Sequence, residues 1–267
     1  MNGTKSVFSR VTIPVTMLVV VFLVSTVRAD FVQEQARQTA DAFNAMNDGR
    51  GYYYTVTPEN GRWNMSTIQG SDKADFGAYS SSVGGENYAK TFCVEPLVGT
   101  GARHYGTLSY TDGATTTQSG HSLTLGAAYL YMAFATGVLD GYNYDSPKYY
   151  EGSELTAAIQ FLIGAVYDQS WYGNDFLASL LNIDADESHW KQVYDPGQHY
   201  DELGDYSVFV MNNHDEYGTH RQDFLYLAGH DENTGSPGAA TPEPATMLIF
   251  GAGLAGLAMV RRRKKAA

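Results

Sequence analysis

Cysteine is almost absent from this chain of 267 residues, which contains a single one, Cys93. One thiol cannot form a disulfide within the chain, and it cannot supply the paired cysteines of the usual zinc and haem motifs. Three alternatives remain for Cys93. It is inert and buried, it pairs with a second molecule, or it is bonded to another group of the same chain.

Positive charge is also scarce once the two ends of the chain are set aside. Residues 30–241 contain nine Lys and Arg against 28 Asp and Glu, which gives a net charge of −19. A surface this acidic repels nucleic acid and anionic lipid, so we expect no nucleic-acid partner. The segment has 212 residues, and aromatic residues make up 13% of the chain, so a packed core is expected rather than a disordered acidic segment.

The motifs that mark hydrolases and metal sites are missing. No Gly-x-Ser-x-Gly element occurs, and the spacing of the seven histidines singles none of them out as a catalytic base. Oxygen-bearing residues alternate from Asn182 to Ser188, but Glu187 and Val193 stand where an EF-hand requires Gly and Glu. We therefore expect a protein that is not an enzyme and that needs no metal and no cofactor.

Residues 1–29 have the three parts of a secretory signal peptide. Two basic residues come first, an apolar stretch follows from Val11 to Val24, and Val27-Arg28-Ala29 has the form of a cleavage sequence. A permanent N-terminal membrane helix is the alternative, but Arg28 ends the apolar stretch too early for one. We predict cleavage between Ala29 and Asp30.

The last 26 residues combine three features in order. Pro242-Glu243-Pro244 comes first, and an apolar run at 246–260 follows. The chain then ends in a basic block: Arg261, Arg262, Arg263, Lys264 and Lys265. A helix over 15 residues is about 22 Å long, which is short against a hydrocarbon core of about 30 Å. Because it is so short, this predicted transmembrane helix suits a transient anchor. The basic residues after it stay on the cytoplasmic side.

This tail resembles the PEP-CTERM sorting signal of exported Gram-negative proteins. The resemblance implies two processing partners, signal peptidase and exosortase, the second being an integral-membrane protease-transpeptidase that recognises the Pro-Glu-Pro element. It also implies a route through the inner membrane, with the C-terminus cytoplasmic, to the cell surface or the extracellular matrix. An ordinary C-terminal tail anchor is the alternative. Residues 231–241, rich in Gly, Pro, Asn and Ser, are expected to be the flexible linker before the signal.

Residues 30–230 are predicted to be one α+β body, in which strands flank a small helical insertion. Apolar residues at helical spacing predict a helix after Ser122, another from about Ser153 and a short one over 176–181. Further predicted elements are a helix over 31–47, a loop over 72–85, and strands at 52–57, 91–94, 107–110, 206–211 and 224–228. Strands, then helices, then strands argue against a parallel doubly wound sheet.

One pair of residues in the body has a recognisable chemical pattern. Cys93 lies in Phe92-Cys93-Val94-Glu95-Pro96 at the end of a predicted strand, and Gln160 lies in the predicted helix, within Ala158–Ile163. From about residue 91 onward, this resembles the thioester domains of Gram-positive surface adhesins. The resemblance implies that the Cys93 thiolate attacks the Gln160 carboxamide, releases ammonia and leaves an electrophile for a partner's amine. Such a bond must be kept from water, and the nearby aromatic residues are Phe92, Phe161, Tyr167, Trp171 and Tyr172.

Two alternatives for the body therefore stand. In the first, an exported surface or biofilm-matrix protein uses a Cys93–Gln160 thioester for covalent adhesion to an amine-bearing surface protein. In the second, Cys93 is inert, and the body is a non-covalent structural or carbohydrate-binding matrix protein that contacts a matrix polysaccharide. Thioester domains often carry a tryptophan a few residues after the glutamine, whereas here Gly164 lies in that stretch and the nearest tryptophan is Trp171.

Overall fold

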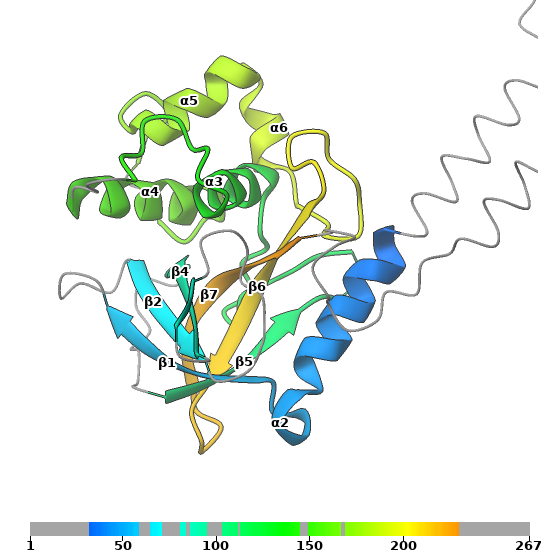
Figure 1. Ribbon diagram of the computed structural model, residues 1–267. Coiled ribbons are helices and arrows are strands. Elements are labelled where there is room, and N and C mark those ends of the chain that lie inside the picture. The colour runs from blue at the N-terminus through cyan, green and yellow to red at the C-terminus, as the bar shows by residue number, and fades with distance from the viewer. Residues whose placement is uncertain are drawn as a thin grey trace, which may run out of the picture. The chain divides into compact units, whose positions relative to one another are not determined.

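A seven-stranded antiparallel sheet forms the centre of the computed structural model (Figure 1). The structure describes residues 32–58, 65–70, 81–83, 86–94, 103–111, 113–144, 149–166 and 169–229. The chain divides into two units, Met1–Asp231 and Glu232–Ala267, and all described residues belong to the first. The predicted signal peptide, with its cleavage site at Ala29 and Asp30, and the predicted tail from Pro242 onward lie outside the described residues.

The strand order is β3-β4-β2-β1-β5-β6-β7, so the last two strands of the chain pair with strands that precede the helices. The bounds are β1 (Tyr52–Pro58), β2 (Met65–Gly70), β3 (Ser81–Val83), β4 (Glu86–Phe92), β5 (Arg103–Ser109), β6 (Tyr206–His214) and β7 (His220–Gly229). All neighbouring strands run antiparallel. A bulge between Met211 and Asn213 interrupts the register of β6 with β7.

The sheet curls so that β4 meets β7. Cys93, directly after β4, forms an antiparallel bridge with Phe224, and Val94 N donates to Asp223 O over 3.1 Å. The Thr91 hydroxyl donates to Leu225 O (2.7 Å) and accepts from Leu225 N (3.1 Å). We call this contact between residues 91–94 and 223–225 the β4–β7 seam. A side chain thus satisfies backbone groups of β7 where no full ladder of backbone hydrogen bonds forms.

Four helices from the middle of the chain cover one face of the sheet: α3 (Leu125–Ala135), α4 (Tyr149–Leu162), α5 (Asp175–Ile183) and α6 (Glu187–Lys191) (Figure 1). Ten of the 11 residues of α3 are buried, so this helix is the centre of the larger core. The Thr124 side chain accepts from Ala127 N at its start, and Asn174 caps α5 in the same way.

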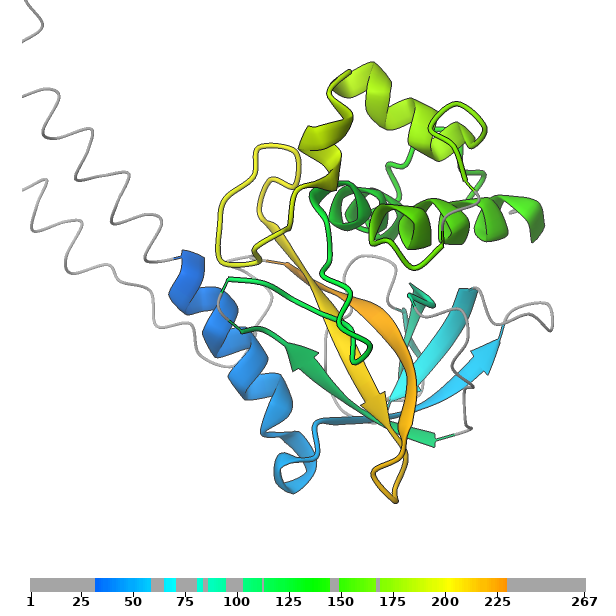
Figure 2. The same cartoon turned by 180° about the vertical axis from the view of Figure 1, so that it is seen from behind.

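A second core lies between the sheet and a helix at residues 32–44, which occupies a different side of the sheet from α3–α6 (Figure 2). This helix contributes Ala36, Ala40 and Phe43, and the short α2 (Met46–Gly49) follows it. Along β7, Leu225 and Leu227 enter the larger core, and Phe224, Tyr226 and Ala228 enter the second. β7 is therefore apolar on both faces because both of its faces are covered.

The predicted α+β class is confirmed, as is the order of strands, helices and strands. Several predicted boundaries are wrong. The cap of α3 is Thr124 rather than Ser122, α4 begins at Tyr149 rather than near Ser153, and β3 lies inside the predicted loop over 72–85. The sequence analysis did not identify β2 or α6. β2 has only two apolar residues, and α6 has five residues, too few to show a helical period.

Within the described ranges, no helix is long and apolar enough to cross a membrane. The predicted transmembrane helix at 246–260 lies outside those ranges, so its prediction stands untested by the fold.

The seam predicts a specific effect of Thr91→Val. Valine keeps the shape of threonine but leaves the buried Leu225 N without its acceptor, whereas Leu225 O keeps the Tyr131 hydroxyl as a donor at 2.9 Å. We expect a loss of about 1–3 kcal/mol in the free energy of unfolding, measured by urea denaturation. The control is Thr91→Ser, which keeps the hydroxyl and loses one methyl, at a cost of about 1 kcal/mol. Equal stability of the valine variant and the wild type would contradict the role given to this hydroxyl.

Candidate functional site

The structure brings Cys93 and Gln160 together from positions 67 residues apart in the chain. Gln160 Nε2 lies 3.9 Å from Cys93 Sγ and donates to Cys93 O over 2.9 Å. Because Nε2 is about 1.33 Å from the carboxamide carbon, that carbon lies within about 5.2 Å of the sulfur. The two side chains are 2% and 7% exposed, which keeps bulk water away from both.

Cys93 is positioned by the strands on either side of the seam. Its bridge to Phe224 fixes its backbone, while Phe92 and Val94 on either side enter the larger core. Cys93 itself belongs to the second core. The alternation of a strand therefore places the thiol on the opposite side of the chain from its two apolar neighbours.

Gln160 is positioned by the end of α4. Its neighbours Ala158 and Ile159 are fully buried against α3 and the sheet. Ala165 N donates to Gln160 O (2.8 Å), Gly164 N donates to Phe161 O (3.1 Å), and Gly164 has φ +80°. This left-handed glycine follows the end of α4 at Leu162 and stops the helix there. Gly164, which departs from the thioester-domain pattern, thus has a structural role in this chain.

Two of the aromatic residues predicted near the pair, Phe92 and Trp171, are buried in the structure. Phe92 is fully buried and makes edge contacts with Phe134 (4.7 Å between centroids) and Tyr131 (6.2 Å). Trp171 is 6% exposed and packs edge-on against Phe161 at 5.8 Å. The prediction for Tyr172 was wrong, since it is 84% exposed, and Tyr167 lies outside the described residues.

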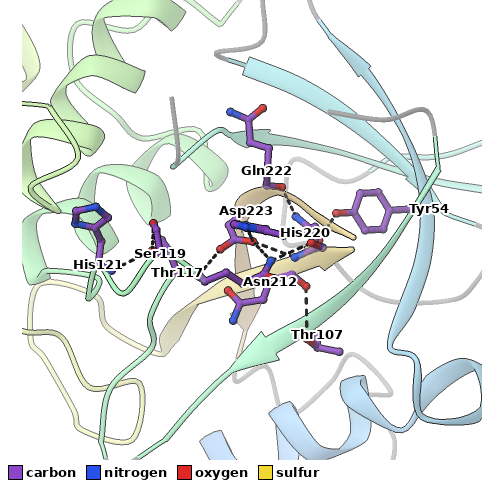
Figure 3. A network of polar contacts seen from close by, with 11 residues as sticks. Tyr54, Thr107, Thr117, Ser119, His121, Asn212, His220, Gln222 and Asp223 are labelled. Atoms are coloured by element: carbon purple, nitrogen blue, oxygen red, sulfur yellow. Dashed lines mark hydrogen bonds and ion pairs between the residues drawn. The ribbon is translucent and has the colours of Figure 1, made fainter. Parts of the chain in front are cut away.

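A buried carboxylate lies next to the seam. Asp223, which is labelled in Figure 3, is fully buried. Its backbone oxygen is the acceptor for Val94 N. Its side chain accepts from Gln118 N (2.7 Å), Gln118 Nε2 (2.7 Å) and Asn213 N (3.0 Å). In the orientation of the Asn212 amide that satisfies both of its ends, the amide nitrogen donates to Asp223 Oδ2 at 3.0 Å. The donors come from β6 and from the 117–120 turn, so one carboxylate ties that turn to the β6–β7 hairpin.

The same network reaches Tyr54 on β1. The Tyr54 hydroxyl donates to Asn213 Oδ1, and Asn213 Nδ2 donates to Gln222 O over 2.7 Å (Figure 3). Burial, followed by the charge of Asp223, holds the pKa of the Tyr54 phenol well above its ordinary value. Tyr54 therefore stays a neutral hydrogen-bond donor at physiological pH. The ring of His220 approaches the carboxylate from the solvent side, with Nε2 at 3.8 Å from Asp223 Oδ1.

Other histidines also lie against acidic residues. His189 Nε2 is 3.0 Å from Glu202 Oε1, and His199 Nε2 is 3.2 Å from Asp201 Oδ1. Among the described residues, no group of three or more His, Cys, Asp or Glu side chains is arranged to hold a metal ion. His189 and His199 therefore each lie beside a carboxylate and are themselves partly exposed.

At the other end of the chain, residues 240–264 match the family model of the PEP-CTERM protein-sorting motif. The C-terminal end of the chain thus carries this sorting motif. The match confirms the prediction made from Pro242-Glu243-Pro244 and the basic block, and it implies export, processing by an exosortase and a transiently membrane-anchored C-terminus. Searches of curated proteins and of solved structures gave no match. Neither comparison therefore assigns a function to the body that precedes the motif.

The sequence alone does not reveal the buried network beside Cys93 and Gln160. Gln222 and Asp223 are two polar residues at the start of the apolar run of β7, and this interruption was the available signal. It does not reveal the partners, because Gln118 is 105 residues away in a Thr-rich turn. The sequence thus points to an unusual residue without pointing to its contacts.

We expect Asp223→Asn to destabilise the protein by about 2–4 kcal/mol, because an amide nitrogen would face N–H donors in a buried site. Glu216→Gln is the matched control, since Glu216 is an exposed acid on the same hairpin. Its effect should stay within about 0.5 kcal/mol. Urea denaturation measures both, and equal midpoints for the two variants would show that the carboxylate does not hold the hairpin.

Proposed function

We propose that this exported, exosortase-sorted protein functions at the cell surface or in the biofilm matrix, where its body attaches covalently to amine-bearing partners through a Cys93–Gln160 thioester. The observation that carries the proposal is the 3.9 Å between Cys93 Sγ and Gln160 Nε2 inside a buried site. It is supported by the use of the chain's single cysteine at this position.

The proposed chemistry has two steps. In the first, the Cys93 sulfur attacks the Gln160 carboxamide carbon, the C–N bond breaks, and Nε2 leaves as ammonia with the proton of the thiol. In the second, a partner's amine attacks the same carbon, the C–S bond breaks, and the sulfur takes up a proton. The product is an amide between Gln160 and the partner. Neither step needs a metal, a cofactor or an oxidant.

Burial supports the survival of such a bond. A thioester hydrolyses when water reaches its carbonyl carbon, and both partners here are more than nine-tenths buried. In the unbonded form, Gln160 Nε2 is held by Cys93 O, so the atom that must leave lies beside the sulfur that must attack. Holding reacting groups at contact distance removes much of the entropic cost of bringing them together.

The charge of the body supports a basic partner. With a net charge of −19 over residues 30–241, the surface attracts lysine-rich proteins at low ionic strength and accelerates their encounter. Lysine side chains are also the amines that proteins present. We therefore propose an amine-bearing surface or matrix protein as the partner.

The second candidate function is non-covalent, with Cys93 inert in a structural or carbohydrate-binding matrix protein. One observation favours it. The hydrogen bond from Gln160 Nε2 to Cys93 O already satisfies two buried groups, so the pair is stable without any reaction.

Intact mass of the exported protein distinguishes the two functions. Thioester formation releases ammonia, so the freshly purified protein should be about 17 Da lighter than its sequence. Methylamine should then discharge the bond and leave the amine on Gln160, as peptide mapping can show. The isosteric variants Cys93→Ser and Gln160→Glu should show neither change.

Two outcomes of the mass experiment would reject the thioester. One is a full sequence mass in protein that has never met an amine. The other is a mass deficit that methylamine cannot reverse, because that deficit marks a different dehydration or crosslink. The exposed residue Gln192 provides a control, since Gln192→Ala should keep both the deficit and its reversal.

A further inference from the structure

The ammonium group of Lys191 lies over two aromatic rings, one of which belongs to Phe161, the residue after Gln160. Its Nζ is 4.9 Å from the centroid of Phe161 and 5.4 Å from that of Trp171. These are the contacts that the structure records for this ammonium within the described part of the chain, and no carboxylate is among them. The body has 28 acidic residues, yet this lysine lies over rings and not beside a carboxylate. This indicates that the two rings by themselves attract a cation.

The two rings form a fixed surface. Trp171 is 6% exposed, and it meets Phe161 edge-on at an interplanar angle of 87°. Rings in this arrangement present an electron-rich face and an adjacent edge, and an ammonium within about 6 Å of such faces is attracted to them. The indole nitrogen of Trp171 is buried and has no hydrogen-bond partner among the described residues. The indole ring of Trp171 is thus positioned by its packing contacts and not by a hydrogen bond from its nitrogen.

One of the two rings follows, in the chain, the glutamine whose carboxamide reacts in the proposed function. Phe161 directly follows Gln160 at the end of α4, and its backbone oxygen accepts from Gly164 N at 3.1 Å. Trp171 packs on Phe161 from the segment before α5, and Lys191 reaches both rings from the last residue of α6. Phe161 and the Gln160 carboxamide are therefore carried by consecutive residues of α4, and Trp171 completes the ammonium-binding surface from another segment.

We propose that Phe161 and Trp171 form a binding site for alkylammonium groups, which Lys191 occupies in the resting protein and which a lysine of the partner takes over before it reacts. This inference rests on the proposed function for its role but not for its existence. Lys191 is exposed on a five-residue helix, so its side chain can leave the rings without unfolding the core.

The order of events keeps the chemistry balanced. The partner's ammonium displaces Lys191, loses one proton to solvent water, and attacks the Gln160 carbonyl carbon as the neutral amine. The C–S bond breaks, and the Cys93 sulfur takes up the second proton that the nitrogen loses. The site acts by raising the local concentration of the amine, so it selects acceptors that carry a positive charge over neutral nucleophiles.

The site can be tested without the thioester. In the exported Cys93→Ser protein, tetramethylammonium is a cation that cannot react, and the indole N–H resonance of Trp171 reports its binding by NMR. We expect Lys191→Met to raise its affinity about tenfold, because the internal competitor is gone. Adding Phe161→Leu should abolish binding, whereas Tyr172→Leu, a change at the exposed neighbouring ring, should leave it intact.

Three results would overturn the site. They are a lack of saturable binding in the Lys191→Met variant, equal binding of uncharged tert-butanol, and binding that survives Phe161→Leu. Since none of these measurements requires a thioester, the site can fail while the mass experiment succeeds, and the reverse also holds.

Reaction rates test the role of the site in acceptor choice. With Cys93 intact, Phe161→Leu should slow discharge by butylamine, which is charged at pH 7, about threefold to tenfold. Discharge by hydroxylamine, which is neutral at that pH, should change less than about twofold. Lys191→Met should accelerate the butylamine reaction. Equal slowing of both nucleophiles by Phe161→Leu would show that the ring shapes the pocket and does not bind the ammonium.

Discussion

The seam between β4 and β7 is the constraint on which the site depends. Without the seam, the end of β4 and the strand β7 would be two open edges. The chain around Cys93 would then be exposed and would have a neighbouring strand on one side only. In this protein the two strands meet, and Thr91 supplies hydrogen bonds where the backbone ladder does not. Cys93 is therefore buried at a closure of the sheet, where the Gln160 side chain of α4 reaches it.

The buried carboxylate of Asp223 is compatible with the fold because it accepts hydrogen bonds from several donors. Asp223 accepts at least three hydrogen bonds in a site with no exposure, and its backbone oxygen also accepts from the residue after Cys93. A buried carboxylate without such donors would strongly destabilise the fold or take up a proton. This network links the turn at 117–120, the β6–β7 hairpin and the strand that carries the thiol, and it makes the backbone around Cys93 rigid.

The C-terminal sorting motif and the burial of the single cysteine in the body are consistent with one another. The PEP-CTERM motif implies passage into a compartment where exposed thiols are prone to oxidation, and the body there has one cysteine, which is 2% exposed. This cysteine lies beside a glutamine amide near one end of α4, and the ring of the next residue binds a lysine ammonium. The proposed reaction with an amine uses all three groups: the thiol, the carboxamide and the ring. The non-covalent alternative accounts for the burial of Cys93 but gives no reason for the position of Lys191.

The sequence by itself determined the sorting tail, because a motif, an apolar run and a basic block are contiguous and need no folding to be recognised. It also determined the α+β class and proposed Cys93 with Gln160, since periodicity and a short resemblance are local signals. Only the tertiary structure decided that these two side chains lie at 3.9 Å, that Asp223 is bound by Gln118, and that Lys191 lies over Phe161 and Trp171. Each of these contacts joins separate segments of the chain, and local pattern does not record which segments the closure of a sheet and the packing of helices bring together.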